Sequence, residues 1–190
     1  CGPDVGVWGF ACGQFRPWRV FHAGGLCHVL RHDLGRHGLH QRFAGGHGGG
    51  GGLGRALSLA LAKDGWTIGI TDLKQEALDE SKKLIEAAGG KAFTYSFDVS
   101  NRAAYKNAFD DYIAKAGGLD LLINNAGVGD GGLVGEYALE SWEWITGINQ
   151  MAVIYGSHYA VPVMKAQKSG HIISIASAAG LANMPNMGMY

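Results

Sequence analysis

The first 54 residues of this 190-residue chain lack eight common residue types: Ser, Thr, Ile, Lys, Glu, Asn, Met and Tyr. The same stretch holds 16 of the 32 glycines, six of the eight histidines and all three cysteines. Natural domains seldom have so biased a composition. We therefore expect residues 1–47 to be an anomalous Gly/His/Arg-rich segment outside the native fold, such as a GC-rich gene translated in a shifted frame would produce.

Other absences exclude several classes of protein. The net charge is zero, which argues against a general nucleic-acid binder. Three cysteines are too few for a disulfide framework. The longest apolar stretch, residues 151–164, is interrupted by Gly156, His158 and Pro162 and is too short to span a bilayer. Since no signal-peptide pattern is present, we expect a cytoplasmic protein with no nucleic-acid or membrane partner.

Cysteine and histidine residues in the anomalous segment raise the question of a metal site. The candidates are Cys27, His28, His32, His37 and His40. No C-x-x-C pair is present and the spacing fits no zinc-finger pattern, so biased composition explains these residues better and we expect no metal. A Cys/His metal module fused to a degenerate domain remains the alternative.

From residue 55 onward the composition is ordinary, and strand and helix patterns alternate. Strands are expected at residues 66–72, 92–97, 119–124 and 171–175, and helices at about 55–64, 75–88, 102–116 and 140–167. The strands are continuous apolar runs, which is typical of a parallel sheet covered on both faces. The predicted fold class is α/β with a doubly wound parallel sheet, the Rossmann fold, which binds ligands at the carboxyl ends of its strands.

A glycine-rich turn precedes the first of these helices. Gly48, Gly52 and Gly54 stand in the run H-G-G-G-G-G-L-G. Such a turn lets backbone N–H groups approach a pyrophosphate at the positive end of the helix dipole. Five consecutive glycines are equally typical of a flexible linker, so this turn alone does not decide the function.

Asp72 ends the strand that follows this helix, 18 residues after Gly54. A carboxylate at this point accepts hydrogen bonds from both ribose hydroxyls and repels a 2′-phosphate, which favours NAD over NADP. The alternative is that Asp72 caps the next helix. Arg55 argues in the opposite direction, because a cation near the turn could tolerate the phosphate.

Further motifs appear in a fixed order along residues 48–190. They are the sequence N-N-A-G at residues 124–127, Asn149 in a long helix, Ser177 thirteen residues before Tyr190, and the pair Asp98-Val99. Together with the glycine spacing, this set resembles the short-chain dehydrogenase/reductase family in its compact branch. Residues 48–190 then form a partial NAD(P)-binding Rossmann domain.

The resemblance implies a role for each site residue. Those implied to bind the cofactor are Gly48, Gly52, Leu53 and Gly54 at the pyrophosphate, Asp72 at the ribose, Asp98 and Val99 at the adenine, and Asn125, Ala126 and Gly127 beside the central strands. Those implied to be catalytic are Ser177, which would hydrogen-bond the substrate oxygen, Tyr190 as general acid/base, and Asn149, which would hold a water chain.

Each catalytic candidate also has a structural alternative. Ser177 could cap a turn, with Ser174 as a nearby competitor; Tyr190 could be an exposed aromatic residue; and Asn149 could be a polar residue inside a helix. The implied function is an oxidoreductase that transfers hydride between NAD, less readily NADP, and a small alcohol or carbonyl substrate, in a protein that is a homo-oligomer at full length. The alternative is a non-enzymatic nucleotide-binding remnant.

Two departures from the family pattern lead us to expect an incomplete, poorly folded copy. Residues 40–47 contain no apolar run, so the first strand is expected to be missing, at a cost on the order of 10 kcal/mol against a net stability of about 5–15 kcal/mol. The final strands are also expected to be absent. The family's lysine four residues after the tyrosine would fall beyond residue 190, so we expect negligible turnover.

Overall fold

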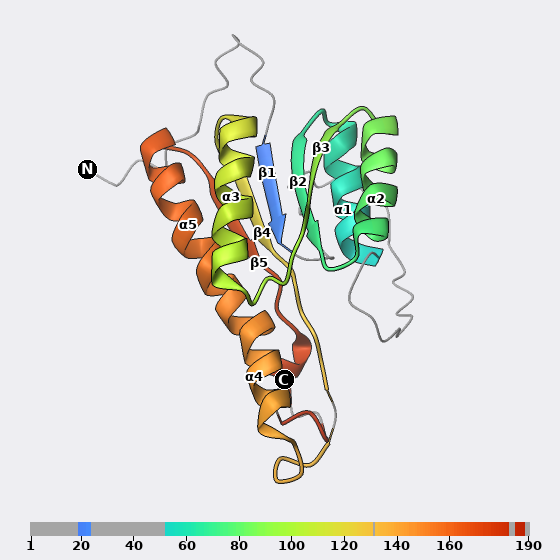
Figure 1. The fold of residues 1–190 in the computed structure, drawn as a ribbon, viewed down its shortest axis with the longest axis vertical. Coiled ribbons are helices and arrows are strands. Elements are labelled where there is room, and N and C mark those ends of the chain that lie inside the picture. The colour runs from blue at the N-terminus through green and yellow to red at the C-terminus, as the bar shows by residue number, and fades with distance from the viewer. Residues whose placement is uncertain (1–18, 24–51, 131, 183–184, 189–190) are drawn as a thin grey trace, which may run out of the picture.

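Five parallel strands form one sheet in the described part of the chain. The computed structural model describes residues 19–23, 52–130, 132–182 and 185–188. The strand order across the sheet is β3-β2-β1-β4-β5 (Figure 1). The bounds are β1 (Arg19–Ala23), β2 (Thr67–Asp72), β3 (Lys91–Ser96), β4 (Leu121–Asn124) and β5 (His171–Ser174).

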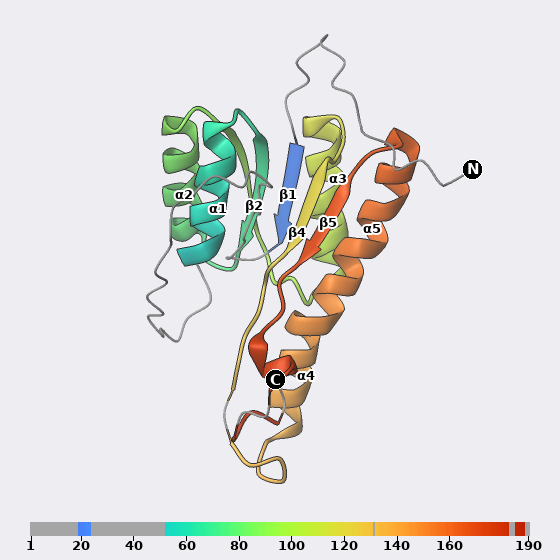
Figure 2. The ribbon, with the colours of Figure 1, turned by 180° about the vertical axis from the view of Figure 1, so that it is seen from behind.

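Helices cover both faces of the sheet. The bounds are α1 (Gly52–Lys63), α2 (Gln75–Ala87), α3 (Arg102–Ala116), α4 (Leu139–Thr146) and α5 (Ala152–Gln167), with a π-helical turn η1 (Gly147–Met151) joining α4 to α5 and a short 3-10 turn η2 (Ala178–Gly180) after β5. Helices α1 and α2 lie side by side on one face, and α3 and α5 lie on the other (Figures 1 and 2). The predicted doubly wound parallel sheet is confirmed.

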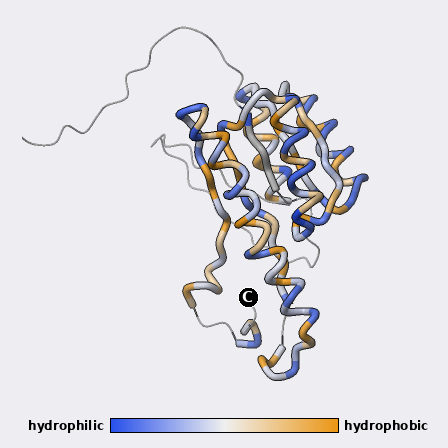
Figure 3. The backbone as a smooth tube through the Cα atoms, turned by 60° about the vertical axis from the view of Figure 1, so that its left-hand side comes forward, coloured by the Kyte–Doolittle hydropathy of each residue, from blue (hydrophilic) through white to orange (hydrophobic). Residues whose placement is uncertain are grey.

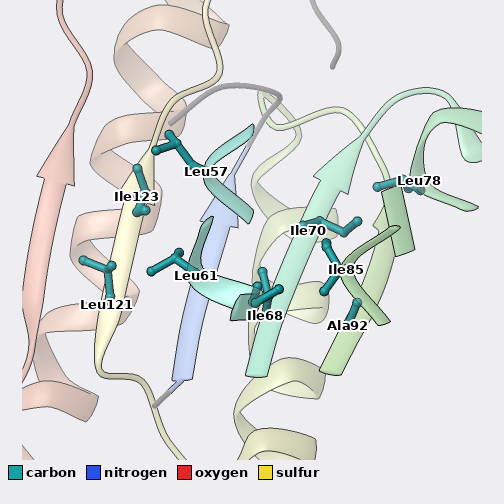
Figure 4. Packing of buried hydrophobic residues seen from close by; sticks show 10 residues of the cluster. Leu57, Leu61, Ile68, Ile70, Leu78, Ile85, Ala92, Leu121 and Ile123 are labelled. Carbon is teal, nitrogen blue, oxygen red and sulfur yellow. The ribbon is translucent and has the colours of Figure 1, made fainter. Parts of the chain in front are cut away.

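The core consists of two apolar clusters, one on each face of the sheet. Successive side chains of a strand point to opposite faces, and β4 shows this alternation. Leu121 and Ile123 belong to the cluster beneath α1 and α2, where Leu57 and Leu61 pack against them (Figure 4). Leu122 belongs to the cluster beneath α3 and α5. Strand β4 is therefore buried on both sides, as its continuous apolar sequence predicts.

The buried face of α2 includes a polar residue. Leu78 and Ile85 are buried, whereas Leu84 is 40% exposed. Ser81, only 8% exposed, takes the inward position instead, because residues 78, 81 and 85 share one face at helical spacing. Hydrophilic and hydrophobic residues alternate along the helices in Figure 3, as expected where one helix face packs on a sheet.

Strand β1 corrects the expectation that the centre of the sheet would lack a strand. That expectation rested on residues 40–47, but the central position is taken by residues 19–23, which pair in parallel with β2 and β4. Arg19 anchors this strand: its backbone N–H and its Nε both donate to Oδ2 of Asp120, at 2.8 and 3.0 Å, and its carbonyl accepts from the Asp120 N–H. Backbone pairing and this partly buried ion pair hold β1 between its two neighbours.

The described part of the chain lacks two kinds of feature. No helix there is long and apolar enough to cross a membrane. No group of three or more His, Cys, Asp and Glu side chains there is arranged to hold a metal ion. The cysteine and histidine candidates of the anomalous segment, residues 27–40, lie outside the described residues.

Candidate active site

The carboxyl ends of the five parallel strands meet at one edge of the sheet, and the predicted site residues follow these ends. Along this edge the structure places the start of α1 after β1, Asp72 at the end of β2, Asp98 and Val99 after β3, residues 125–127 after β4, and Ser177 after β5. Gly48 and Tyr190 lie outside the described residues. The topology therefore places the described site residues that follow a strand at the same edge of the sheet.

The first turn of α1 presents backbone N–H groups at this edge. Gly52 begins the helix and Gly54 is buried in its first turn, while the side chain of Leu53 packs against the core beneath α1. The first N–H groups of a helix have no partner within it, and the helix dipole makes this end positive. This end of α1 is thus suited to bind an anionic group.

Asp72 stabilises the turn between β2 and α2 and keeps one carboxylate oxygen for other partners. Its Oδ1 accepts a hydrogen bond of 2.9 Å from the Lys74 N–H. Among the described residues, Oδ2 has no partner. The N-cap residue of α2 is Lys74, without a side-chain capping bond, so Asp72 is not the helix cap that the sequence left as an alternative. A half-buried carboxylate with a free oxygen can accept hydrogen bonds from ribose hydroxyls.

Asp98 organises the turn after β3. Its Oδ1 accepts from the backbone N–H of Ser100 at 2.9 Å and from the Ser100 hydroxyl at 2.7 Å. The adjoining Val99 is buried in the core, and the Phe97 N–H donates to the Asp72 carbonyl, so the ends of β2 and β3 are joined. Both acidic residues thus stand on neighbouring, connected turns.

Buried polar side chains at the end of β4 connect it to its neighbours. The Asn124 amide donates to the Ser157 hydroxyl of α5 at 3.3 Å and to the Ser174 hydroxyl of β5 at 3.2 Å. Asn125 is buried next to it. Ser174, the competitor of Ser177, is exposed at the end of β5, and its hydroxyl accepts this hydrogen bond from Asn124.

Asn149 lies in the π-helical turn η1 and holds the loop that follows β4. Its Oδ1 accepts from the Val128 N–H and its Nδ2 donates to the Val128 carbonyl, both at 2.8 Å. Single π-helical turns inside α-helices occur frequently at functional sites. The Asn149 side chain approaches Gly127, where an added Cβ atom would lie 3.8 Å from its Oδ1. The structure thus brings Asn149 together with residues 126–128.

Ser177 caps η2 and retains a donor. Its hydroxyl oxygen accepts from the Ala179 N–H at 3.1 Å. The capping role considered in the sequence analysis is therefore present. A hydroxyl that accepts one hydrogen bond still carries its own hydrogen, so Ser177 is able to donate to a substrate oxygen at the same time.

Sequence reasoning missed Tyr137, which links two loops at this edge. Its hydroxyl donates to the Asn186 carbonyl at 3.0 Å, and the Gly132 N–H donates to the same oxygen at 2.9 Å. Desolvation and the Asp130 charge raise the pKa of Tyr137, so the phenol remains a donor at neutral pH. The contact joins residues 49 positions apart, and no local pattern in the sequence signals it.

Comparisons with known proteins identify the family of this chain. The model of the short chain dehydrogenase family matches residues 47–190. The dehydrogenase/reductase of CLA biosynthesis from Lactiplantibacillus plantarum is 34% identical over 73% of this chain and 49% of its own length. The L-2,3-butanediol dehydrogenase of Corynebacterium glutamicum is 36% identical over 75% of this chain and 57% of its own length.

A solved structure of a short-chain dehydrogenase/reductase has the same fold. A short-chain dehydrogenase/reductase from Burkholderia phymatum in complex with NAD is 36% identical, with a TM-score of 0.70 over 72% of this chain and 49% of that one. The chain spans about half the length of the relatives that it matches. The family model covers most of the chain and the fold is the same, so the chain belongs to the short chain dehydrogenase family.

Proposed function

We propose that residues 48–190 form part of an NAD-binding oxidoreductase domain that acts on a small alcohol or carbonyl substrate. The observation that carries the proposal is the Asp72 carboxylate at the end of β2, on the sheet edge at which α1 begins. The hydroxyls of an adenosine ribose would donate hydrogen bonds to Asp72, and a pyrophosphate would bind at the N-terminus of α1. Related proteins whose names specify alcohol dehydrogenases, and the NAD complexes among the solved structures, support the proposal.

The residues present fit a nicotinamide dinucleotide. The first turn of α1 presents backbone N–H groups beside the buried Gly54, and within the described part of the chain only Oδ1 of Asp72 accepts a hydrogen bond. When bound, the nicotinamide supplies or accepts a hydride. Ser177 would donate a hydrogen bond to the substrate oxygen while it caps η2, and Asn149 would fix the loop of residues 126–128 against the cofactor. Tyr190 would hold the proton that the oxygen gains or loses.

Titration of the purified chain with NADH tests cofactor binding. Asp72→Asn is expected to weaken NADH binding by about tenfold to a hundredfold, because hydrogen bonds to a charged group are lost. Asp64→Asn is the control: Asp64 is an exposed carboxylate that follows the other end of α1. Equal NADH affinity in wild type and Asp72→Asn would contradict the proposal.

Catalysis is tested separately from binding. NADH oxidation in the presence of a generic ketone measures turnover. NADH binding that depends on Asp72 without any turnover would favour the alternative, a non-enzymatic nucleotide-binding protein. Turnover that is lost in Ser177→Ala and Tyr190→Phe would establish the enzyme.

A further inference from the structure

In the sequence, Arg55 is a cation near the glycine-rich turn that would tolerate the 2′-phosphate of NADP. The structure shows which residues its guanidinium contacts. Arg55 lies in the first turn of α1, and its guanidinium reaches across to α2. Its Nη2 donates to Oε2 of Glu80 at 2.8 Å, and its Nε donates to the hydroxyl of Ser81 at 3.1 Å. The Ser81 hydroxyl in turn donates to the Ala77 carbonyl at 2.7 Å. The cation is therefore engaged by two consecutive residues of α2.

This contact joins the first turn of α1 to the second turn of α2, two helices that both begin at the edge where the ribose would bind. Helix α1 begins at this edge, and β2 ends there with Asp72, two residues before the N-cap of α2. Helices α1 and α2 are neighbours on the same face of the sheet (Figure 2). A guanidinium recognises a phosphate through paired hydrogen bonds, so an arginine released from α2 in this region would attract a 2′-phosphate.

We propose that Glu80, assisted by Ser81, is a positioning residue that holds Arg55 on α2 and thereby favours NAD over NADP. This inference rests on the proposed function. For Arg55 to bind the 2′-phosphate of NADP, its hydrogen bonds to Glu80 and Ser81 would first have to break. Because only the protein molecules with a released Arg55 could make this contact, the apparent affinity for NADP is lowered. NAD lacks the 2′-phosphate, so its binding does not require Arg55 to leave Glu80. Asp72 and the Arg55–Glu80 pair then act in the same direction.

The contact is of moderate strength, which sets the size of the expected effect. Arg55 is 25% exposed and Glu80 63% exposed. Exposed ion pairs change an equilibrium by about fivefold at most. The buried Ser81 hydroxyl adds a second contact that keeps the guanidinium oriented.

The test compares the dissociation constants of NADH and NADPH for the full 190-residue chain, measured by fluorescence titration at constant low salt. Glu80→Gln removes the charge that holds Arg55 and keeps the size of the side chain. It is expected to lower the ratio of the NADPH constant to the NADH constant by about fivefold. An unchanged ratio would overturn the inference. Because Glu80 is largely exposed, the variant is expected to fold, and far-UV circular dichroism checks this.

Two further variants separate a released arginine from a simple change of charge. Glu76→Gln removes the same charge from the first turn of α2, nearer the sheet edge, and Glu76 makes no described contact with Arg55. It is expected to leave the ratio within about twofold; a shift as large as that of Glu80→Gln would refute the inference. In Arg55→Gln/Glu80→Gln the gain in NADPH binding is expected to disappear. Failure of the wild type to bind either dinucleotide would overturn the proposed function and this inference with it.

Discussion

At the scale of single residues, Asn149 holds the loop after β4 through both polar atoms of its amide. Asn149→Ala leaves the N–H and carbonyl of Val128 without these partners. We expect the free energy of unfolding to fall by about 1–3 kcal/mol, the usual cost of leaving a half-buried polar group unpaired. Urea unfolding followed by tryptophan fluorescence measures the loss, and hydrogen exchange at the Val128 amide is expected to accelerate.

The neighbouring residue provides the control for Asn149. Gln150 lies in the same π-helical turn and is exposed. Gln150→Ala is therefore expected to leave both the unfolding free energy and the Val128 exchange rate close to wild type. If the two variants behaved alike, the amide of Asn149 would not hold the loop.

Gly156 allows α5 to approach the polar end of β4. A Cβ atom at this position would collide with Oδ1 of Asn124 and the hydroxyl of Tyr105, and would lie 3.4 Å from Cδ2 of Leu122. Tyr105 is fully buried, and its ring packs edge-on against Phe97 and Tyr155. Gly156→Ala is therefore expected to destabilise the protein by about 1–3 kcal/mol, as overpacking does.

A glycine-to-alanine substitution at a position with room for the added Cβ atom provides the control for Gly156→Ala. Gly135 would have nothing within 4 Å of an added Cβ atom. Gly135→Ala should then be neutral or slightly stabilising in thermal unfolding, because alanine reduces the freedom of the unfolded chain. A neutral Gly156→Ala would mean that α5 packs less closely on β4 than the structure shows.

At the scale of elements, the contact between Arg19 and Asp120 fixes β1 to the start of β4. Both side chains are 16% exposed, and Oδ2 of Asp120 accepts two hydrogen bonds from Arg19. Asp120→Ala leaves a half-buried guanidinium without its partner, and we expect a loss of about 1–3 kcal/mol in urea unfolding. Asp110→Ala provides the contrast, because the Lys106–Asp110 pair on α3 is exposed and its loss should cost less than about 1 kcal/mol. Equal effects would show that β1 does not depend on this ion pair.

Most elements could be predicted from the sequence, because their signals are local. Helix α3 ends at Gly117 in the left-handed conformation that glycine favours, and its start is capped by Asn101. Strands β2 and β4 are apolar runs that lie buried within the sheet. The sheet edge as the candidate site follows from topology alone, because parallel strands end together.

The rest depends on contacts between distant parts of the chain, which no local pattern encodes. Arg55 appeared as a free cation in the sequence, but its partner Glu80 stands 25 residues away on another helix. The Tyr137–Asn186 contact joins two loops across 49 residues. The place of β1 follows from pairing with β2 and β4 and from Asp120, 101 residues further along the chain. Residue identity and periodicity contain no information about such partners.

At the scale of the whole molecule, the central strand decides whether the two halves of the sheet hold together. Strand β1 separates β2 and β3 from β4 and β5, and it pairs with a neighbour on each side. Without β1, the strands β2 and β4 would have no partner to connect them. The two apolar clusters would then lose the centre of the sheet on which they pack. The composition of residues 1–47 nevertheless predicts a segment outside the native fold, a prediction that still requires an experiment.

Two truncations supply that experiment. Removal of residues 1–18 keeps β1, and removal of residues 1–23 deletes it. Each lost backbone hydrogen bond costs about 0.5–1.5 kcal/mol, so deleting β1 between two neighbours should cost on the order of 5 kcal/mol more than the shorter truncation. That difference is comparable to the whole stability of a domain, about 5–15 kcal/mol, so the longer truncation is expected to lose its cooperative urea transition. If both truncated chains unfolded with the same midpoint, β1 would contribute nothing to the sheet, and the anomalous segment would extend through residue 47 as its composition predicts.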